Sequence, residues 1–435
     1  MLSRQLKAVI RTTLFLLTLS GFCKAQSGVS SPYSRYGIGD INDLGFYSNF
    51  GMGGISLSMT NSTNVNISNP ASYAWFEPQS VLFEIGAETK HVNLETTDTN
   101  QITNGTTMAY LAFGFPIKKW WGSSFGLRPY STNNYNVADK ATLTNIGTID
   151  YNYEGTGGIN EVFWGNGFKI GDFAIGLNSS YLFGPLQKNK SEIFEDPNTF
   201  NYYHNELINI GGFSFKSGLQ YKIVLDSLKD QELKNKITLS VGGVFDLETN
   251  LKARRKIIGV TFDEYVTDPF LILPKDTILD TEDSGSIILP GGYGAGISLG
   301  IGNSWLIGFD YYSKNWSSFS SFDIQDSLSD YTKVVFGLQF TPNPDDRDKY
   351  FNKVRYRLGL HQENTYINIK GMQLNKSGIS FGLGLPLRRI KSYINLGIEL
   401  GQRGTTDNNL IKENYWRAGF GITLGDIWFV KRKYD

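Results

Sequence analysis

Cysteine is almost absent from this sequence: its 435 residues include one, Cys23. Cys23 falls within an expected leader that ends at Ala25, so the mature chain would hold no thiol. Disulfide frameworks, thiol catalysis and cysteine-based metal sites are therefore excluded for the mature protein.

An excess of charge of either sign is also missing, since 41 Lys and Arg residues balance 41 Asp and Glu residues. No basic stripe stands out along the chain, which excludes nucleic acid as a partner. Long apolar runs are missing too. After residue 25 no apolar stretch reaches the roughly 18 residues that a membrane helix needs.

The N-terminus is typical of a secretory signal peptide. Arg4, Lys7 and Arg11 form a basic region, and the apolar stretch 12–22 follows it. Cys23-Lys24-Ala25 then offers a cleavage site, so we expect residues 1–25 to be removed on export. Acylation of Cys23 is the alternative, but a bulky phenylalanine precedes this cysteine where a small residue is needed.

From residue 80 onward, apolar and polar side chains alternate with a period of two. The segments 81–88, 394–401 and 416–424 each have one continuous apolar face. Segments of about ten residues suit tilted membrane strands, whereas soluble strands average about five or six. Their other faces carry Gly, Ser, Asn and isolated charges, as the lumen of a barrel does. The mean hydropathy of −0.24 agrees with this mixture. The fold class predicted is all-β, a transmembrane antiparallel β-barrel.

We expect about fourteen strands in a barrel spanning 80–424. Their ranges are 80–89, 105–117, 121–130, 155–169, 172–184, 207–223, 236–249, 292–302, 304–313, 331–341, 353–361, 377–387, 391–402 and 414–424.

The links between these strands alternate in length. Tight links are expected at 118–120, 170–171, 302–303 and 388–390, and long polar loops at 131–154, 185–206, 250–291, 314–330, 362–376 and 403–413. Short turns on one side and long loops on the other are typical of outer-membrane barrels, with the short side periplasmic. The links 224–235 and 342–352 are longer than this rule expects.

Two end segments lack the alternation. Residues 26–79 are rich in Gly, Ser and Asn but also in aromatic residues, which favours a packed hatch or plug inside the barrel over a disordered tail. Residues 425–435 form a basic, aromatic C-terminal tail.

The hatch segment resembles that of the FadL-type outer-membrane transporters, which admit hydrophobic compounds. The resemblance rests first on the glycines Gly51, Gly53 and Gly54 and on Asn69, Pro70 and Ala71. Further along, the stretches 305–311, 316–319, 338–342 and 356–359 are similar to that family's later strand motifs. The resemblance implies a monomeric fourteen-stranded barrel in the outer membrane, closed by a hatch, for passive uptake of hydrophobic compounds such as long-chain fatty acids.

The same resemblance implies a lateral opening beside a kinked third strand. The third expected strand ends at Arg128-Pro129-Tyr130, and proline removes one hydrogen bond from a ladder. We therefore place the opening at these residues. The alternative is that Pro129 simply ends the strand.

A second function stays open. The C-terminal tail and the start Ser31-Pro32-Tyr33 resemble FadL-related barrels of Bacteroidota-type bacteria, some of which are partner or plug subunits of type nine secretion machinery. The alternative is thus a non-transporting subunit of a secretion system or other surface assembly. An apolar lumen pocket with a gap in the wall would favour transport, and a polar lumen with an unbroken wall would favour assembly.

Enzyme chemistry is not expected. The three histidines are His91, His204 and His361. None has a partner residue at the sequence spacing that is typical of a catalytic or metal site. We therefore expect no catalytic residue, no metal and no cofactor. The partners expected are outer-membrane lipid, a hydrophobic small molecule or a secretion-complex protein.

Several charged residues fall on the lumen face of the predicted strands. They are Glu84, Glu88, Lys216, Asp246, Asp310, Glu399 and Arg417. We expect them to pair with one another and to hold the hatch. Glu84 and Arg417 lie in the first and last strands, so an ion pair between them across the closing seam is predicted.

Overall fold

The computed structural model describes residues 29–427 except 43–44, 145, 197, 226–235, 264–272, 347 and 388–391. The expected signal peptide lies outside the described residues. So do most of the C-terminal tail, the tight link at 388–390 and most of the link 224–235.

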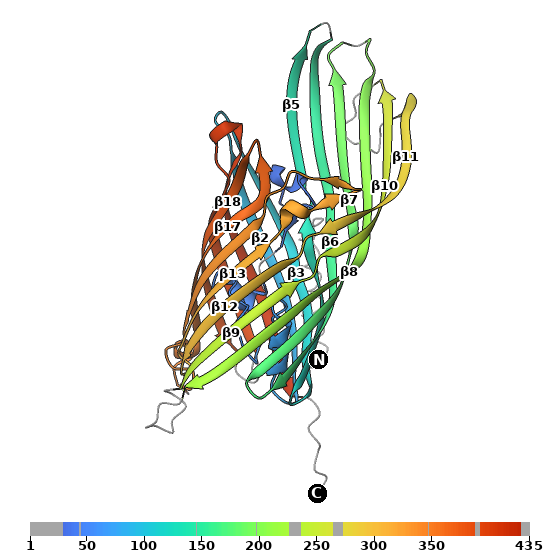
Figure 1. Ribbon diagram of the computed structural model, residues 1–435. Helices are drawn as coiled ribbons and strands as arrows, with labels where there is room; N and C mark the ends of the chain where they lie inside the picture. The colour runs from blue at the N-terminus through green and yellow to red at the C-terminus, as the bar shows by residue number, and fades with distance from the viewer. Residues whose placement is uncertain are drawn as a thin grey trace, which may run out of the picture.

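Fourteen antiparallel strands close into a barrel, as the sequence predicts (Figure 1). Each strand pairs with the next around the ring, and the first pairs with the last from Ser80↔Ile427 to Glu95↔Lys412. In chain order the barrel strands are β2 (Ser80–Glu95), β3 (Asn100–Lys118), β4 (Trp121–Thr132), β6 (Gly147–Ile170), β7 (Phe173–Phe194), β8 (Asn201–Leu225), β9 (Ile237–Asp246), β12 (Gly292–Ile301), β13 (Trp305–Lys314), β16 (Tyr331–Phe340), β17 (Arg355–Ile369), β18 (Met372–Pro386), β19 (Tyr393–Arg403) and β20 (Lys412–Ile427).

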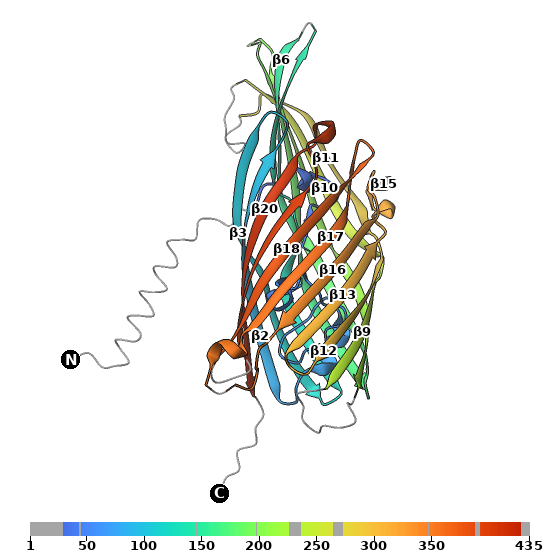
Figure 2. The ribbon, with the colours of Figure 1, turned by 90° about the vertical axis from the view of Figure 1, so that its left-hand side faces the viewer.

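The prediction of long loops is wrong for three stretches, because these stretches are largely strands. The stretches 131–154, 185–206 and 250–291 form an ordered sheet that continues three barrel strands beyond the rim (Figures 1 and 2). We call this sheet the wing. It contains β5 (Tyr135–Leu143), β10 (Thr249–Phe262), β11 (Asp276–Leu289) and the segments of β6, β7 and β8 between them. The wing stands on the side of the long loops, which is the extracellular side.

Within the described part of the chain, the wing has two open edges. β5 pairs with β6 alone, and β11 pairs with β10 and, through Ile287 and Ile288 only, with β14 (Ser320–Ser321). Within the sheet, Arg255 donates to Asp283 from Nε (3.1 Å) and Nη2 (2.6 Å), joining β10 to β11. These hydrogen bonds hold the pKa of Asp283 below its usual value.

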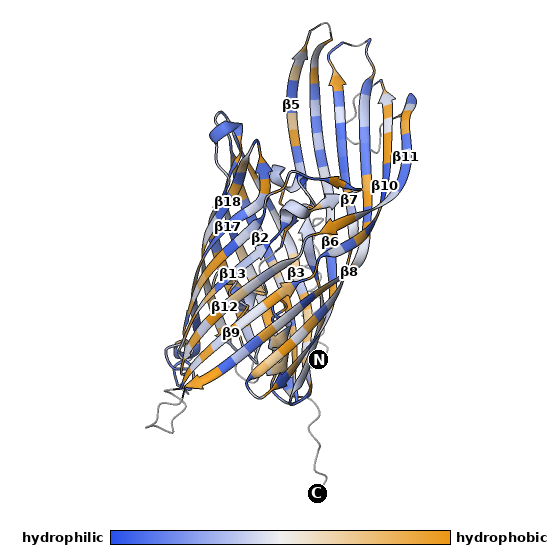
Figure 3. Ribbon diagram, in the orientation of Figure 1, coloured by the Kyte–Doolittle hydropathy of each residue, from blue (hydrophilic) through white to orange (hydrophobic). Residues whose placement is uncertain are grey.

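Hydrophobic and hydrophilic residues alternate along the barrel strands (Figure 3), and many of the hydrophobic ones are exposed on the outer wall. On β19, Ile398 and Leu400 are 43% and 49% exposed, while the intervening Glu399 is fully buried. Such alternation follows from the strand geometry and fits lipid outside and polar groups inside. Trp120, Trp305 and Trp416 keep large exposed areas near strand ends, as interfacial aromatics do.

The N-terminal segment lies inside the barrel. It contains η1 (Pro32–Arg35), β1 (Asp40–Ile41), α2 (Tyr47–Phe50) and η2 (Pro70–Trp75). We call residues 29–42 and 45–79 the inner segment. Glycines of the wall make room for its backbone: a Cβ at Gly359 would collide with Met52 and Gly53, and one at Gly122 with Tyr73. The many glycines on the lumen faces therefore have a packing reason.

Two apolar clusters pack the inner segment at different heights. The lower one joins Phe46, Phe50 and Tyr73 to wall residues such as Leu82 and Phe163. The upper cluster reaches across the extracellular mouth. It gathers Tyr33, Ile38, Ile159, Leu182, Leu186, Ile208, Ile210, Leu251, Ala253, Ile287, Leu289, Trp316, Phe319, Leu328, Tyr331, Tyr366, Ile367, Leu374 and Leu410.

The remaining elements are short. They are η5 (Trp316–Ser318), β15 (Ile324–Gln325), η6 (Tyr350–Lys353) and η7 (Asp407–Asn409). Among the described residues, no helix is long and apolar enough to cross a membrane.

Candidate functional site

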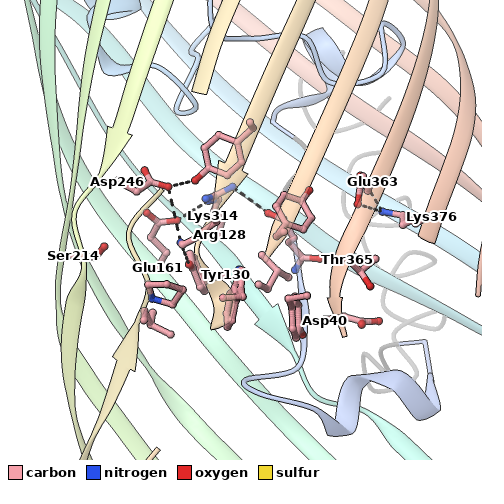
Figure 4. Close-up of a pocket in the computed structure, with 18 of the residues that line it drawn as sticks. Asp40, Arg128, Tyr130, Glu161, Ser214, Asp246, Lys314, Glu363, Thr365 and Lys376 are labelled. Atoms are coloured by element: carbon pink, nitrogen blue, oxygen red, sulfur yellow. Dashed lines mark hydrogen bonds and ion pairs between the residues drawn. The ribbon is translucent and has the colours of Figure 1, made fainter. Parts of the chain in front are cut away.

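A charged chamber lies inside the barrel between the two apolar clusters (Figure 4). It holds about 1460 Å³ of space, including the part that is open to solvent. Its ionisable lining comprises seven basic and six acidic side chains, so basic groups exceed acidic ones by one. They are Lys90, Arg128, Lys216, Lys314, Lys376, Arg403 and Arg417 against Asp40, Glu88, Glu161, Asp246, Glu363 and Glu413.

One ion network lies under the wing side of the chamber. Arg128 Nε of β4 is 2.7 Å from Glu161 Oε2 of β6, and Ser180 Oγ donates to the other carboxylate oxygen at 2.7 Å. Asp246 of β9 lies 3.3 Å from Lys216 Nζ and 3.9 Å from Lys314 Nζ. The contacts join residues of six wall strands: β4, β6, β7, β8, β9 and β13.

A second network ties the inner segment to the opposite wall. Arg403 of β19 contacts Asp40 Oδ1 of β1 at 2.7 Å and Glu413 Oε2 of β20 at 2.9 Å. Ser31 Oγ donates to the other oxygen of Glu413 at 2.6 Å. Charge-assisted hydrogen bonds of this kind are stronger than neutral ones, so they hold residues 31–40 firmly in place.

A third network surrounds Glu363 of β17. Lys333 Nζ lies 3.3 Å and Lys376 Nζ 3.4 Å from its carboxylate. The buried ring of His361 has its Nε2 3.7 Å from Glu363 Oε1 and 3.9 Å from Glu399 Oε1. In this way three networks of matched charges line the chamber, beside apolar and aromatic side chains such as Leu289, Tyr331 and Ile367.

The predicted pair between Glu84 and Arg417 is wrong. Arg417 Nη2 lies 2.8 Å from Glu399 Oε2, and its Nη1 lies 3.8 Å from Glu88 Oε2. The register of the seam places Thr423 opposite Glu84 and Lys90 opposite Arg417. The two predicted partners are thus separated along the seam, although both face the lumen.

Glu84 and Asp310 contact the backbone of the inner segment instead. Glu84 Oε1 accepts a hydrogen bond from Val65 N at 2.7 Å. Asp310 Oδ2 accepts from Ser56 N at 2.7 Å and from Leu57 N at 2.9 Å. Each carboxylate satisfies backbone donors that have no strand partner, so both hold the inner segment to the wall.

The first motif of the predicted hatch fits closely against β17 and β18. Gly51 packs on the backbone of Gly382, and Gly53 N donates to Ser380 Oγ at 2.8 Å. Gly53 and Gly54 adopt φ values of +71° and +91°, which favour glycine.

The second motif caps the short helix η2. Asn69 Oδ1 accepts from Ala71 N at 3.1 Å with Pro70 at the first helical position. Asn69 Nδ2 also donates to Leu57 O at 2.6 Å and to Leu219 O of β8 at 3.1 Å. Ala71 is fully buried against the wall. These residues serve packing and turn geometry.

The predicted lateral opening, at Arg128, Pro129 and Tyr130, lies where β4 leaves β3. The ladder between these strands ends on the extracellular side at Leu111↔Leu127, and the register of β4 against β6 shifts after Pro129. Above this point β4 pairs with β1 of the inner segment, and Asn42 N donates to Tyr130 O at 2.9 Å. Among the described residues, the upper part of β3 pairs with β2 alone.

A side pocket opens at this parting of the wall. It holds about 630 Å³ of space, including its mouth. The lining comes from Thr107–Tyr110 of β3, from Arg128 and Pro129 of β4, and from the inner segment at Phe46 and Phe50. Glu88, Lys376 and Arg417 line both this pocket and the central chamber, so the two spaces adjoin.

Several chamber residues lie just beyond the ends of the predicted strands. Lys90 follows the predicted segment 80–89, and Glu363, Arg403 and Glu413 fall in stretches expected to be loops. Continuing the two-residue alternation past the apolar belt would have placed all four on the lumen side. The alternation continues through these stretches, but polar residues on both faces of the strands concealed it.

The described residues were also compared with the predictions for metal ligands and histidines. No group of three or more His, Asp or Glu residues is arranged to hold a metal ion in that part of the chain. His91 stacks on Trp416 at 5.5 Å, His204 lies in the wing, and His361 is buried in the chamber wall.

Comparison with solved structures supports the fold. The toluene transporter TodX of Pseudomonas putida aligns with a TM-score of 0.57 and 15% identity over 88% of this chain and 98% of its own. A FadL homologue of Pseudomonas aeruginosa gives a TM-score of 0.57 and 10% identity over 90% and 100%. The toluene transporter TbuX of Ralstonia pickettii gives 0.56 and 12% over 88% and 98%. At these identities the likeness shows a shared fold, the FadL-type barrel that the hatch motifs resemble.

Comparison of the sequence itself identifies the family. No curated protein sequence matches the chain. The sequence profile of the family described as BamG matches residues 6–435, nearly the whole length. The chain therefore belongs to the BamG family.

Proposed function

We propose that this chain is a non-transporting subunit of an outer-membrane surface assembly, with the barrel as its anchor and the wing as its docking element. The observation that carries the proposal is the set of ion networks that cross the chamber between the two apolar clusters. Sites for hydrophobic compounds are mostly apolar, with a few polar groups. The ion networks place charged groups along the path that such a compound would take through the lumen.

The wing supplies the second argument for assembly. It carries half-buried aromatic side chains, Tyr151, Tyr153 and Tyr202, on one face. Its edges at β5 and β11 are open in the described part of the chain, and open edges pair readily with other chains. A channel needs no ordered sheet above its rim, whereas a subunit that binds another surface protein does.

Uptake of hydrophobic compounds, such as long-chain fatty acids, is the second candidate. The parting of β3 from β4 favours it, since a break in the wall offers a path to the membrane. The transporters TodX and TbuX share the fold. The ion networks weigh against this candidate, because they place charged side chains in the chamber between the mouth and the side pocket.

Two measurements on the same strain separate the candidates. The chain is tagged at its natural level and purified from native outer membranes in mild detergent, and uptake of labelled oleate and toluene is measured in cells with and without it. An assembly subunit elutes in one complex of defined mass, and its loss leaves uptake unchanged. A monomer whose loss lowers uptake would overturn the proposal and establish the second candidate.

A further inference from the structure

The wing has a long strand at one side, β11, whose outer edge is open in the described part of the chain. β11 runs for 14 residues, whereas strands average about five or six. It pairs with β10 from end to end, but on its other side only Ile287 and Ile288 have a strand partner. From Asp276 to Ser284 every side chain except Leu279 is exposed. Edges of this length are normally blocked, covered or paired with another chain.

The foot of this edge already pairs with another part of the chain. β14 lies antiparallel to Ile287 and Ile288, next to the barrel rim. Phe322 N then donates to Ser286 O at 2.9 Å. The chain turns away at Phe322 and Asp323, whose φ values of +51° and +61° lie in the left-handed region. The edge therefore accepts a strand where the chain supplies one, and above Ser286 no described segment does so.

The side chains of this edge carry charge of one sign. β11 has four acidic residues and no lysine or arginine; the acids are Asp276, Asp280, Glu282 and Asp283. Two such edges placed together would bring like charges opposite one another, which is destabilising, so a second copy of β11 does not fit here. The other open edge of the wing differs, because β5 holds one acid and one base, Asp139 and Lys140. Only the edge of β11 therefore selects a partner by its charge.

The strand on the inner side of β11 shows which kind of sequence these acids select. β10 has four basic residues near its middle, Lys252, Arg254, Arg255 and Lys256. Arg255 lies directly opposite Asp283 and donates to both of its carboxylate oxygens. Arg254 Nε lies 3.7 Å from Glu282 Oε1, and Lys256 lies directly opposite Glu282. Opposite charges on facing strands stabilise a sheet, so β11 is matched by a basic strand on the side that the chain itself fills.

Two acids of the edge are left without a basic partner. Asp276 and Asp280 make no ion pair with any residue that the structure describes. In register they lie opposite Thr261 and Ile258 of β10, which are uncharged. β10 thus compensates the middle of β11 and leaves its upper part negative. A strand added on the outer side would meet this uncompensated charge.

We propose that the open edge of β11 binds an extended, basic segment of the partner protein, which adds one strand to the wing. Lysine or arginine side chains at alternate positions of this segment lie beside Asp280 and Glu282, as Lys256 of β10 does on the other side of Glu282. The backbone ladder supplies affinity, and the acids select a basic segment over a neutral or acidic one. The inference rests on the proposed docking role of the wing and names the chemistry of the segment that docks.

Charge reversal tests the edge in the full-length chain purified from native outer membranes. Asp276→Lys combined with Asp280→Lys reverses the two uncompensated acids and breaks no ion pair among the described residues. We expect the yield of the complex to fall at least about tenfold, because like charges across an interface are strongly disfavoured. Asp98→Lys combined with Asp407→Lys makes the same change of charge in exposed loops outside the wing and should leave the yield unchanged.

Protection of a single thiol locates the docked segment. Because the mature chain is expected to hold no cysteine, Ser284→Cys places one thiol at the exposed edge. We expect a maleimide to label this thiol in the chain released from the complex but not within the complex. Asp98→Cys should be labelled in both. Folding of every variant is checked by the heat-dependent shift in gel migration, and if the double lysine variant does not fold, thiol protection decides alone.

The outcomes separate this site from the docking role of the wing. A complex that survives the charge reversal at full yield, or a thiol at residue 284 that stays reactive within the complex, would overturn the site and leave the docking role standing. A complex made only of copies of this chain would also overturn the site. A wild-type chain that purifies as a monomer would overturn the docking role, and the site with it.

Discussion

Arg417 of β20 and Glu399 of β19 form a buried ion pair, with Nη2 and Oε2 2.8 Å apart and the two residues directly opposite in register. Glu399 is fully buried, and Tyr415 OH donates to its other oxygen at 2.9 Å. The pair lies next to the seam where the last strand meets the first. It shows how the lumen is organised: wall charges pair along the wall, and the carboxylates left over hold the inner segment.

Loss of one partner of this pair is expected to destabilise the barrel strongly. Glu399→Gln leaves the guanidinium of Arg417 without its nearest counter-charge in a poorly hydrated lumen. We expect the free energy of unfolding in urea to fall by about 3–5 kcal/mol, as for other buried pairs that lose one partner. The control Asp150→Asn breaks the exposed pair with Lys140 in the wing and should change stability by less than about 1 kcal/mol. Equal effects for the two variants would contradict a buried role for the pair.

Asp310 is expected to hold the inner segment without being needed for the barrel itself. Asp310→Ala removes the acceptor of Ser56 N and Leu57 N, at about 1–3 kcal/mol for each buried donor left unpaired. Hydrogen exchange should accelerate at these two amides and at their neighbours, while the ladder of β13 stays protected. Asp310→Asn keeps one acceptor oxygen and should restore most of the protection. Unchanged hydrogen exchange at these amides in the alanine variant would show that Asp310 does not hold the inner segment.

Close packing of the inner segment predicts sensitivity at wall glycines. Gly359→Ala would push a methyl group into the backbone at Met52 and Gly53, and overpacking of this kind costs about 1–3 kcal/mol. The matched variant Gly243→Ala meets nothing closer than 3.8 Å and should be neutral or slightly stabilising. Thermal unfolding monitored by gel migration compares the two. A Gly359→Ala protein as stable as the wild type would mean that the inner segment packs loosely.

The wing predicts contacts with a partner on its aromatic face. A photoreactive phenylalanine analogue in place of Tyr153 or Tyr202 should give one discrete crosslinked species in living cells. The same analogue at Phe309, which is 44% exposed on the lipid-facing wall, serves as the control and should give none. Crosslinks from Phe309 but not from the wing would place the partner against the barrel wall and contradict the docking role of the wing.

The sequence predicted the barrel well because the membrane imposes a simple pattern. Every strand that crosses lipid must alternate, and residues such as Ile398, Glu399 and Leu400 show that alternation plainly. The fourteen predicted segments all correspond to barrel strands. The wing was predicted as loops because water on both sides removes the requirement for an apolar face, so Lys188 and Asn189 lie next to each other in a strand without any alternating signal.

The site was harder to predict than the fold. The two-residue alternation correctly placed Glu84 and Arg417 on the lumen side. Which lumen residues meet depends on the register of the seam, and that register sets Lys90 opposite Arg417. The contacts of Glu84 and Asp310 with the inner segment depend on how residues 45–79 fold inside the barrel. No periodic pattern describes that path, because it follows gaps left by the glycines of the wall.

The central claim is that the barrel anchors a subunit and does not transport. The most direct measurement compares the native mass of the complex purified from outer membranes for the wild type and for a chain whose wing hairpin 136–154 is replaced by a short Gly-Ser turn. We expect the wild type in a complex of defined mass and the shortened chain as a folded, heat-modifiable monomer, with oleate and toluene uptake equal in both strains. A wild-type chain that purifies as a monomer and raises uptake of either compound would contradict the account.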